Sequence, residues 1–193
     1  MLLDALSVKG PVHLVGLSMG GAISAIFTAR HPEKVKKLVL EGPAGSPVSM
    51  PFVGKLVRAP VLGDALMAVF GGLVISRGAD RAFYDKTKVP EFRKIFRDQL
   101  HYTGYLRSLL STLRYFNLSD QVWAFREVGR QNRPVLLIWG RQDALVPFEN
   151  NAIVRAAIPG AVFAPFDRAG HVPHYERPGE VGPLLVDFLK KQS

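Results

Sequence analysis

The chain has 193 residues with 48% apolar and 21% charged side chains, typical of a globular protein, and it contains no cysteine, which excludes a disulfide framework or a thiolate metal site. Its formal net charge is +9 at pH 7, but the basic residues are scattered and form no nucleic-acid-binding motif. We therefore expect a basic solvated surface and no nucleic-acid partner, with a weak attraction to anionic membranes as the alternative.

The N-terminal residues, MLLDALSVKG, do not resemble a signal peptide, because their apolar run is short, is interrupted by Asp4 and follows no basic region. The longest apolar tract, 59–75, is interrupted by Asp64 and by glycines, and it is too short to span a bilayer. A cytoplasmic protein is therefore expected.

Strand and helix signals alternate along the chain. The predicted strands are 11–17, 35–43, 134–140 and 161–167. The predicted helices that belong with them are 20–32, 149–157 and 179–191. Near-continuous apolar runs such as PVHLVGL are typical of parallel strands that are covered on both faces. The alternation predicts an α/β fold in which helices flank a parallel sheet.

The pattern changes between the second and third predicted strands. From Gly45 to about Arg133 the chain has helical periodicity, many aromatic residues and no convincing strand. We interpret this stretch as a helical cap insertion at 46–133. The core of the domain is then formed by 1–45 and 134–193.

A serine between glycines marks the turn from the first strand into the first helix. In Gly16-Leu17-Ser18-Met19-Gly20 the chain must turn sharply, which strains Ser18 and exposes its hydroxyl group. Side chains two residues before and after the serine would clash, which explains Gly16 and Gly20. The Met19 N–H lies at the helix start and is the natural donor to an oxyanion. We predict that Ser18 is a nucleophile.

A serine nucleophile needs a base and an orienting carboxylate. Asp143 follows the end of the third strand, and His171 lies in the loop after the fourth. Because the carboxyl ends of parallel strands meet at one edge of a sheet, Ser18, Asp143 and His171 are expected at the same edge.

Alternatives to these two residues stay open. Asp143 could simply cap the turn that follows it, and Asp167 is nearer to the histidine in sequence, although it lies at the strand end. His174 could replace His171. We expect instead that His174 and Glu176 cap the last helix.

With these motifs the sequence resembles the α/β-hydrolase family. The matching pieces are GLSMGG at 16–21, GRQDALVP at 140–147 and AGHVPHYERP at 169–178, in the order of the family. The resemblance extends over nearly the whole chain. Haloalkane dehalogenases and epoxide hydrolases of this fold use an aspartate nucleophile, so the serine disfavours them.

The resemblance implies a serine hydrolase. Ser18 attacks a carbonyl carbon, His171 shuttles the proton, Asp143 orients His171, and water releases the acyl-enzyme. We expect a carboxylic ester of a small to medium apolar acyl group as the small-molecule substrate, bound under apolar cap side chains that could equally pack the cap onto the sheet. The alternatives within the fold are a C–C bond hydrolase and a perhydrolase. No cofactor is implied, and the five histidines show no metal-ligand spacing.

In this family the nucleophile strand is typically the fifth of eight, and an upstream loop supplies a second oxyanion donor. The present sequence has no counterpart of that segment, so we expect an N-terminally shortened fold whose first strand forms an exposed edge. Three explanations remain open. The chain is a truncated copy of an ordinary hydrolase, a shortened esterase that closes the edge as a homodimer, or an inactive hydrolase that binds a partner strand.

Overall fold

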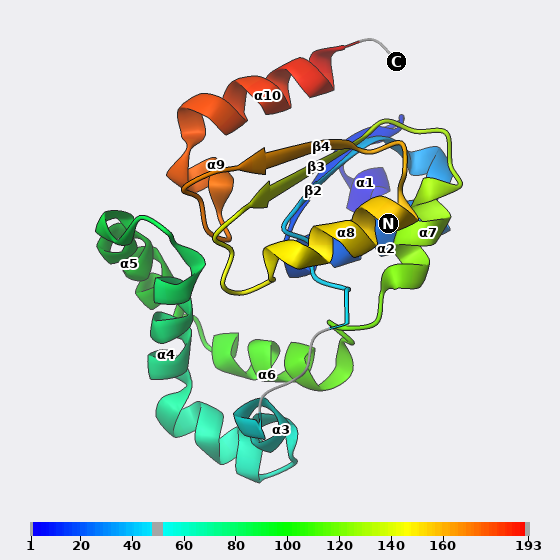
Figure 1. Cartoon of the computed structure of the whole chain (residues 1–193). Coiled ribbons are helices and arrows are strands. Elements are labelled where there is room, and N and C mark those ends of the chain that lie inside the picture. Colours follow the sequence, from blue (N-terminus) through cyan, green and yellow to red (C-terminus); the bar gives the residue numbers. More distant parts are fainter. Residues whose placement is uncertain (1, 48–51, 192–193) are drawn as a thin grey trace.

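The structure of the chain is a computed structural model that describes residues 2–47 and 52–191 (Figure 1). The strands are β1 (Val12–Leu17), β2 (Val35–Glu41), β3 (Val135–Gly140) and β4 (Val162–Phe166). The α-helices are α1 (Leu2–Ala5), α2 (Met19–Arg30), α3 (Phe52–Arg58), α4 (Leu62–Ala82), α5 (Val89–Gln99), α6 (Tyr105–Tyr115), α7 (Val122–Gly129), α8 (Asn151–Ala157), α9 (Pro173–Glu176) and α10 (Pro178–Lys190). Short 3-10 helices lie at η1 (Pro32–Lys34), η2 (Lys86–Lys88) and η3 (Phe148–Asn150).

The four strands form one parallel sheet in the order β1-β2-β3-β4. Neighbouring residues are in register, with Val39 of β2 opposite Val15 of β1 and also opposite Leu136 of β3. The predicted parallel sheet flanked by helices is confirmed. The register fixes which side chains share a face, since paired residues of parallel strands point to the same side.

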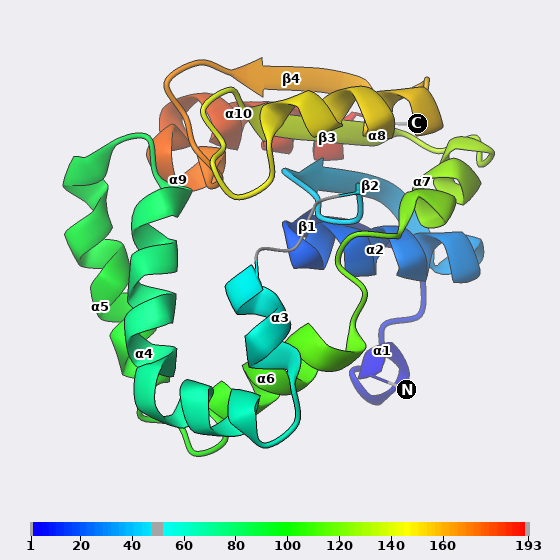
Figure 2. The ribbon, with the colours of Figure 1, turned by 60° about the horizontal axis from the view of Figure 1, so that its bottom comes forward.

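Helices cover the sheet on both faces. One face packs against α2, α7 and α8, and the other packs against α10 (Figures 1 and 2). Leu38, Leu40, Leu137 and Trp139 point to the first face, whereas Val39, Leu136 and Ile138 point to the second. Every residue of β3 is buried, as expected for a strand covered on both sides. The continuous apolar runs in the sequence follow from this double cover.

Helices α3 to α6 gather on one side of the molecule, toward the carboxyl ends of the strands (Figures 1 and 2). Ion pairs join them. The Arg114 guanidinium near the end of α6 lies 2.8 Å from the Asp64 carboxylate in the first turn of α4, and the pair lowers the pKa of Asp64. Arg93 of α5 donates from Nε to Asp80 of α4 at 2.7 Å. These helices lie within the range 46–133 that the sequence predicts as a cap, and we call them and the segments that join them the cap.

Helix α4, with 21 residues, contains most of the apolar tract noted in the sequence. None of the described helices, α4 included, combines the length and the hydropathy needed to cross a membrane.

Helix α7 lies within the range predicted as cap, 46–133, but its contacts are with the core. Ala124, Phe125 and Val128 are fully buried and pack in the cluster that α2 and α8 form with the sheet. The division of the chain into core and cap therefore remains a prediction. Within the predicted cap, the segment Val122–Gly129 packs against the core helices α2 and α8.

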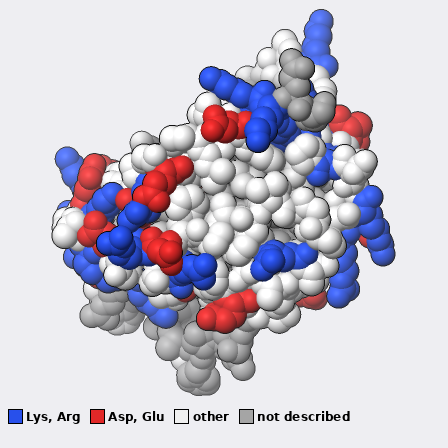
Figure 3. Space-filling model, turned by 45° about the horizontal axis from the view of Figure 1, so that its top comes forward, with Lys and Arg blue, Asp and Glu red and all other residues white. Residues whose placement is uncertain are grey.

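Strand β1 forms one edge of the sheet in the described part of the chain. Val15 shares a face with Val39, yet it is 50% exposed, because α10 covers β2 and β3 but not β1. Seen from the side of α10, the surface has a broad uncharged area with charged side chains around it (Figure 3). The expected homodimer through this edge stays a prediction.

A buried lysine joins β2 to the end of α10. Lys37 is only 2% exposed, and its ammonium group donates hydrogen bonds to the carbonyl oxygens of Phe188, Leu189 and Lys191. The last carbonyl groups of a helix have no partner within the helix and lie at the negative end of its dipole. A cation at this position therefore satisfies the backbone and holds α10 against the sheet.

We predict that Lys37→Met lowers the free energy of unfolding by about 1–3 kcal/mol, because it leaves these carbonyl groups without their charged donor. Urea unfolding followed by circular dichroism measures the change. Lys36→Met is the matched control, since Lys36 is the exposed neighbour on the same strand. Equal stability of the two variants would contradict this role of Lys37.

Candidate active site

Ser18 occupies the turn between β1 and α2 in a conformation that is rare for a residue with a side chain. Its φ is 54° and its ψ is −120°, a type of backbone strain that costs about 1–3 kcal/mol. The backbone around it holds the turn. Ser18 N–H donates to the carbonyl oxygen of Glu41 at 2.9 Å, and Ala44 N–H donates to the Ser18 carbonyl oxygen at 2.9 Å. The strained turn predicted from the sequence is present.

Gly16 and Gly20 differ in why they are glycine. A Cβ atom at Gly16 would lie 2.4 Å from the carbonyl oxygen of Gly20 and 2.5 Å from Ser24 Oγ, so no side chain fits. A Cβ atom at Gly20 would meet no heavy atom within 4 Å outside its chain neighbours and the backbone of its own helix. The steric need expected at Gly20 is therefore absent, because it is the backbone of Gly20 that closes the space beside Gly16.

The hydroxyl group of Ser18 is not used to cap α2. Ser18 is the N-cap residue, and its side chain makes no capping hydrogen bond. In the first turn of α2, Gly21 and Ala22 donate their N–H groups to the Ser18 carbonyl oxygen, whereas the Met19 N–H lies at the very start of the helix, at the positive end of the dipole. The position can thus stabilise a negative charge that develops beside the serine.

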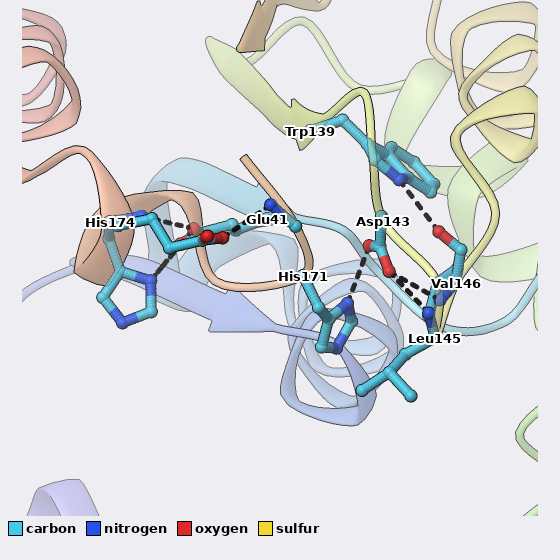
Figure 4. A network of polar contacts seen from close by, with 9 residues as sticks. Glu41, Trp139, Asp143, Leu145, Val146, His171 and His174 are labelled. Atoms are coloured by element: carbon cyan, nitrogen blue, oxygen red, sulfur yellow. Dashed lines mark hydrogen bonds and ion pairs between the residues drawn. The ribbon is translucent and has the colours of Figure 1, made fainter. Parts of the chain in front are cut away.

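Asp143 and His171 form a buried pair. His171 Nδ1 lies 2.7 Å from Asp143 Oδ2, and the two side chains are 6% and 0% exposed (Figure 4). The other carboxylate oxygen, Oδ1, accepts hydrogen bonds from the backbone N–H groups of Leu145 and Val146 at 2.8 and 2.9 Å. Asp143 therefore caps the turn, as one interpretation of the sequence had it, and also binds His171.

Gly42 connects this pair to the serine turn. It has a φ of +43°, and a Cβ atom there would lie 3.1 Å from Asp143 Oδ2 and 3.4 Å from His171 Nδ1. Gly42 also directly follows the residue whose carbonyl oxygen accepts the Ser18 N–H. One short loop therefore lies beside both the Asp143–His171 pair and the serine turn, which places the loops that carry the three residues at the carboxyl edge of the sheet.

The alternative residues have other partners. Asp167 Oδ1 lies 2.9 Å from Arg141 Nε, and the Asp167 side chain is 80% exposed. His174 Nδ1 lies 2.9 Å from an oxygen of the buried Glu41 carboxylate, which also accepts the His174 N–H at 3.0 Å. Figure 4 shows His171 turned toward Asp143, whereas His174 lies apart on Glu41. Asp167 thus pairs with an arginine and not with a histidine, and His174 pairs with Glu41 and not with Asp143.

A profile of the alpha/beta hydrolase family matches residues 2–183. The chain belongs to this family. A 2-hydroxy-6-oxononadienedioate/2-hydroxy-6-oxononatrienedioate hydrolase from Paraburkholderia xenovorans (strain LB400) is 30% identical over 197 residues, which cover 97% of this chain and 65% of that protein. This alpha/beta hydrolase chain thus spans somewhat less than two thirds of the length of that relative.

Solved structures of alpha/beta hydrolases have the same fold. A meta-cleavage product hydrolase from Pseudomonas fluorescens IP01 is 25% identical, with a TM-score of 0.74 over 97% of this chain and 67% of that one. A thermophilic esterase from Thermogutta terrifontis is 22% identical, with a TM-score of 0.78 over 98% of this chain and 68% of that one. In both, about a third of the known chain has no counterpart here.

The expectation that His174 and Glu176 cap the last helix is wrong, since no side chain caps the first turn of α10 in the described structure. His174 binds Glu41, as above. The Glu176 carboxylate instead accepts backbone hydrogen bonds from Gly170 and from Tyr84 and Asp85 of the cap. In the sequence of this hydrolase, Glu176 is marked only by its place shortly after the histidine. That place does not reveal that its partners include the distant Tyr84 and Asp85.

The described residues of this hydrolase include no group of three or more histidine, cysteine, aspartate or glutamate side chains that could hold a metal ion.

We predict a pH-dependent contribution of His174 to stability. The hydrogen bond with Glu41 raises the pKa of His174 above its ordinary value of 6.5, against the opposing effect of burial. The pair therefore stabilises the fold fully below about pH 6.5, and this contribution is lost as the pH rises through the higher folded-state pKa.

NMR titration of the His174 imidazole measures this pKa, and urea unfolding of the wild type and His174→Asn at several pH values measures the stability. The difference in stability should shrink as the pH rises. Glu41→Gln should return the pKa toward its ordinary value. A pKa that stays high in Glu41→Gln would rule out Glu41 as the cause.

Proposed function

We propose that the chain carries the site of a serine hydrolase that cleaves carboxylic esters of small to medium apolar acyl groups. The observation that carries the proposal is the buried contact of 2.7 Å between His171 Nδ1 and Asp143 Oδ2. The strained backbone of Ser18, held beside the same loop, supports it. A carboxylate that accepts a hydrogen bond from Nδ1–H leaves Nε2 of the imidazole unprotonated, so that Nε2 can act as the base.

In the proposed mechanism the Ser18 hydroxyl oxygen attacks the ester carbonyl carbon while His171 Nε2 accepts the hydroxyl proton. The imidazolium then protonates the departing alcohol, and the acyl group remains on Ser18. Water attacks this acyl-enzyme and gives a proton to His171, which passes a proton back to the Ser18 oxygen as the acid is released. Asp143 keeps the imidazole oriented and stabilises its positive charge without taking the proton.

The negative charge on the carbonyl oxygen is expected to lie at the start of α2. There the Met19 N–H and the helix dipole favour an anion. Loss of one such donor typically costs about 10² to 10³ in kcat. The Met19 N–H group therefore has a direct role in the proposal.

The preference for apolar acyl groups is inferred from the cap. Helix α4 carries large apolar side chains that are at least half exposed, among them Val69, Phe70 and Leu73. Apolar surface of this kind on a cap favours the binding of an alkyl chain over that of an acetyl group.

A second candidate is a C–C bond hydrolase of the same fold. It is favoured by the Paraburkholderia relative, whose name gives 2-hydroxy-6-oxononadienedioate as its substrate. Because both reactions use a serine, a histidine and an aspartate, the triad does not separate them. A perhydrolase or an inactive binding module has no specific observation in its favour.

We predict that the chain hydrolyses p-nitrophenyl esters with a higher kcat/KM for butyrate and octanoate than for acetate, and that Ser18→Ala reduces the rate to background. A spectrophotometric assay of the three esters measures this. A flat chain-length profile would count against the apolar acyl pocket. Hydrolysis of 2-hydroxy-6-oxo-6-phenylhexa-2,4-dienoate without ester hydrolysis would favour the second candidate.

Asp143→Asn should lower kcat by about 10⁴, because the amide holds the imidazole in the wrong tautomer and cannot stabilise its charge. Steady-state kinetics on the best ester measures the loss. Asp167→Asn is the matched control, since Asp167 is exposed and pairs with Arg141, and it should retain the rate. Equal effects of the two substitutions would exclude the assigned role of Asp143.

A further inference from the structure

The loop that carries His171 lies in direct backbone contact with the end of the cap helix α4. His171 N–H donates to the carbonyl oxygen of Ala82, the last residue of α4, at 2.6 Å. A Cβ atom at Gly170 would lie 2.4 Å from the same oxygen and 2.8 Å from the backbone nitrogen of Tyr84. No side chain fits between the two segments at this point.

A buried carboxylate completes the contact. Glu176 is 6% exposed, and its Oε2 accepts the Gly170 N–H at 2.5 Å. Its Oε1 accepts the N–H groups of Tyr84 and Asp85, each at 2.8 Å. One carboxylate therefore binds the residue immediately before His171 and two residues of the cap. Hydrogen bonds to an ionised acceptor are about twice as strong as neutral ones.

Packing around Glu176 leaves this carboxylate little freedom. Its neighbour Tyr175 stands edge-on to Phe83 and Phe92 of the cap, with ring centroids 5.6 and 5.5 Å apart. Lys88 donates from Nζ to the carbonyl oxygen of Glu176 at 2.8 Å. The short helix α9 is thereby fixed to the cap beside the carboxylate.

We propose that Glu176 is a positioning residue for His171. It acts through Gly170, holding the imidazole against Asp143, and it links this position to the end of α4, so that the cap and the pair are placed together. The inference rests on the proposed function only in that His171 is the base. Glu176 itself makes no contact with reacting atoms in this role.

The test compares Glu176→Gln with Glu180→Gln, an exposed glutamate on α10 that pairs with Arg177. The side-chain amide introduced by Glu176→Gln would face backbone N–H donors with an NH₂ group, so the loop must shift. A displacement of about 1 Å at a catalytic group can cost 10²-fold. We expect kcat per folded site to fall about tenfold to a hundredfold in Glu176→Gln, with KM little changed. Glu180→Gln should match the wild type.

A second pair of variants tests the cap side. Asp85 has a φ of −78°, within the range of proline, and Asp85→Pro replaces the N–H that Glu176 accepts with a ring carbon, which removes the hydrogen bond and displaces the carboxylate. Asp85→Ala keeps that N–H and loses the same side-chain contacts with Thr87. We expect kcat of Asp85→Pro to be lower than that of Asp85→Ala by about threefold to tenfold or more, because one hydrogen bond is lost and the carboxylate is displaced as well. If Glu176→Gln does not fold, the comparison of Asp85→Pro with Asp85→Ala tests the role of Glu176 instead.

A readout without substrate separates this inference from the proposed function. The proton on His171 Nδ1 should give a far-downfield NMR resonance, because it is shared with Asp143 over 2.7 Å. Glu176→Gln should shift or broaden it, and Glu180→Gln should not. If the wild type hydrolyses no ester, the proposed function fails and this resonance alone decides. A lower melting temperature with unchanged kcat and an unchanged resonance would overturn the role of Glu176.

Discussion

All four strands run in the same direction, and the candidate site depends on this constraint. Because the sheet is parallel, each strand delivers the loop that follows it to the same edge. Ser18 follows β1, Gly42 follows β2, Asp143 follows β3 and His171 follows β4. Loops far apart in sequence thus lie at the same edge, while the strands and helices that carry them stay packed in the core. Helices pack on both faces of β3, and this packing holds in place the strands from which these loops leave.

Three buried carboxylates stand at this edge, and two of them pair with a histidine. Asp143 divides its oxygens between the His171 imidazole and a turn of backbone N–H groups. Glu41 binds His174, and Glu176 binds only backbone N–H groups among its described partners. A buried carboxylate without such donors would be strongly destabilising. The buried carboxylates at this edge therefore all have hydrogen-bond donors, and the proposed catalytic mechanism uses one of them, Asp143.

The strands, the core helices and the three candidate catalytic residues could be predicted from sequence because their signals are local. Apolar runs end in glycine, and Ser18, Asp143 and His171 lie in short motifs directly after them. The role of Glu176 could not be predicted, since its partners are backbone groups 91 and 92 residues away, which leave no mark in sequence. The contacts of α7 with the core were equally hidden, because an amphipathic helix does not reveal which surface it covers.

The contact between the cap and the His171 loop has a consequence for how the two parts can diverge. The groups of the cap that hydrogen-bond to His171 and to the Glu176 carboxylate belong to the main chain, namely the Ala82 carbonyl and the N–H groups of Tyr84 and Asp85. Any residue except proline supplies the same N–H. Apart from Phe83, Lys88 and Phe92, whose side chains contact α9, side chains of the insertion are therefore free to change with the molecule they enclose, provided that the chain after α4 keeps its path. A chimera that exchanges caps between related hydrolases should join its parts outside this short stretch.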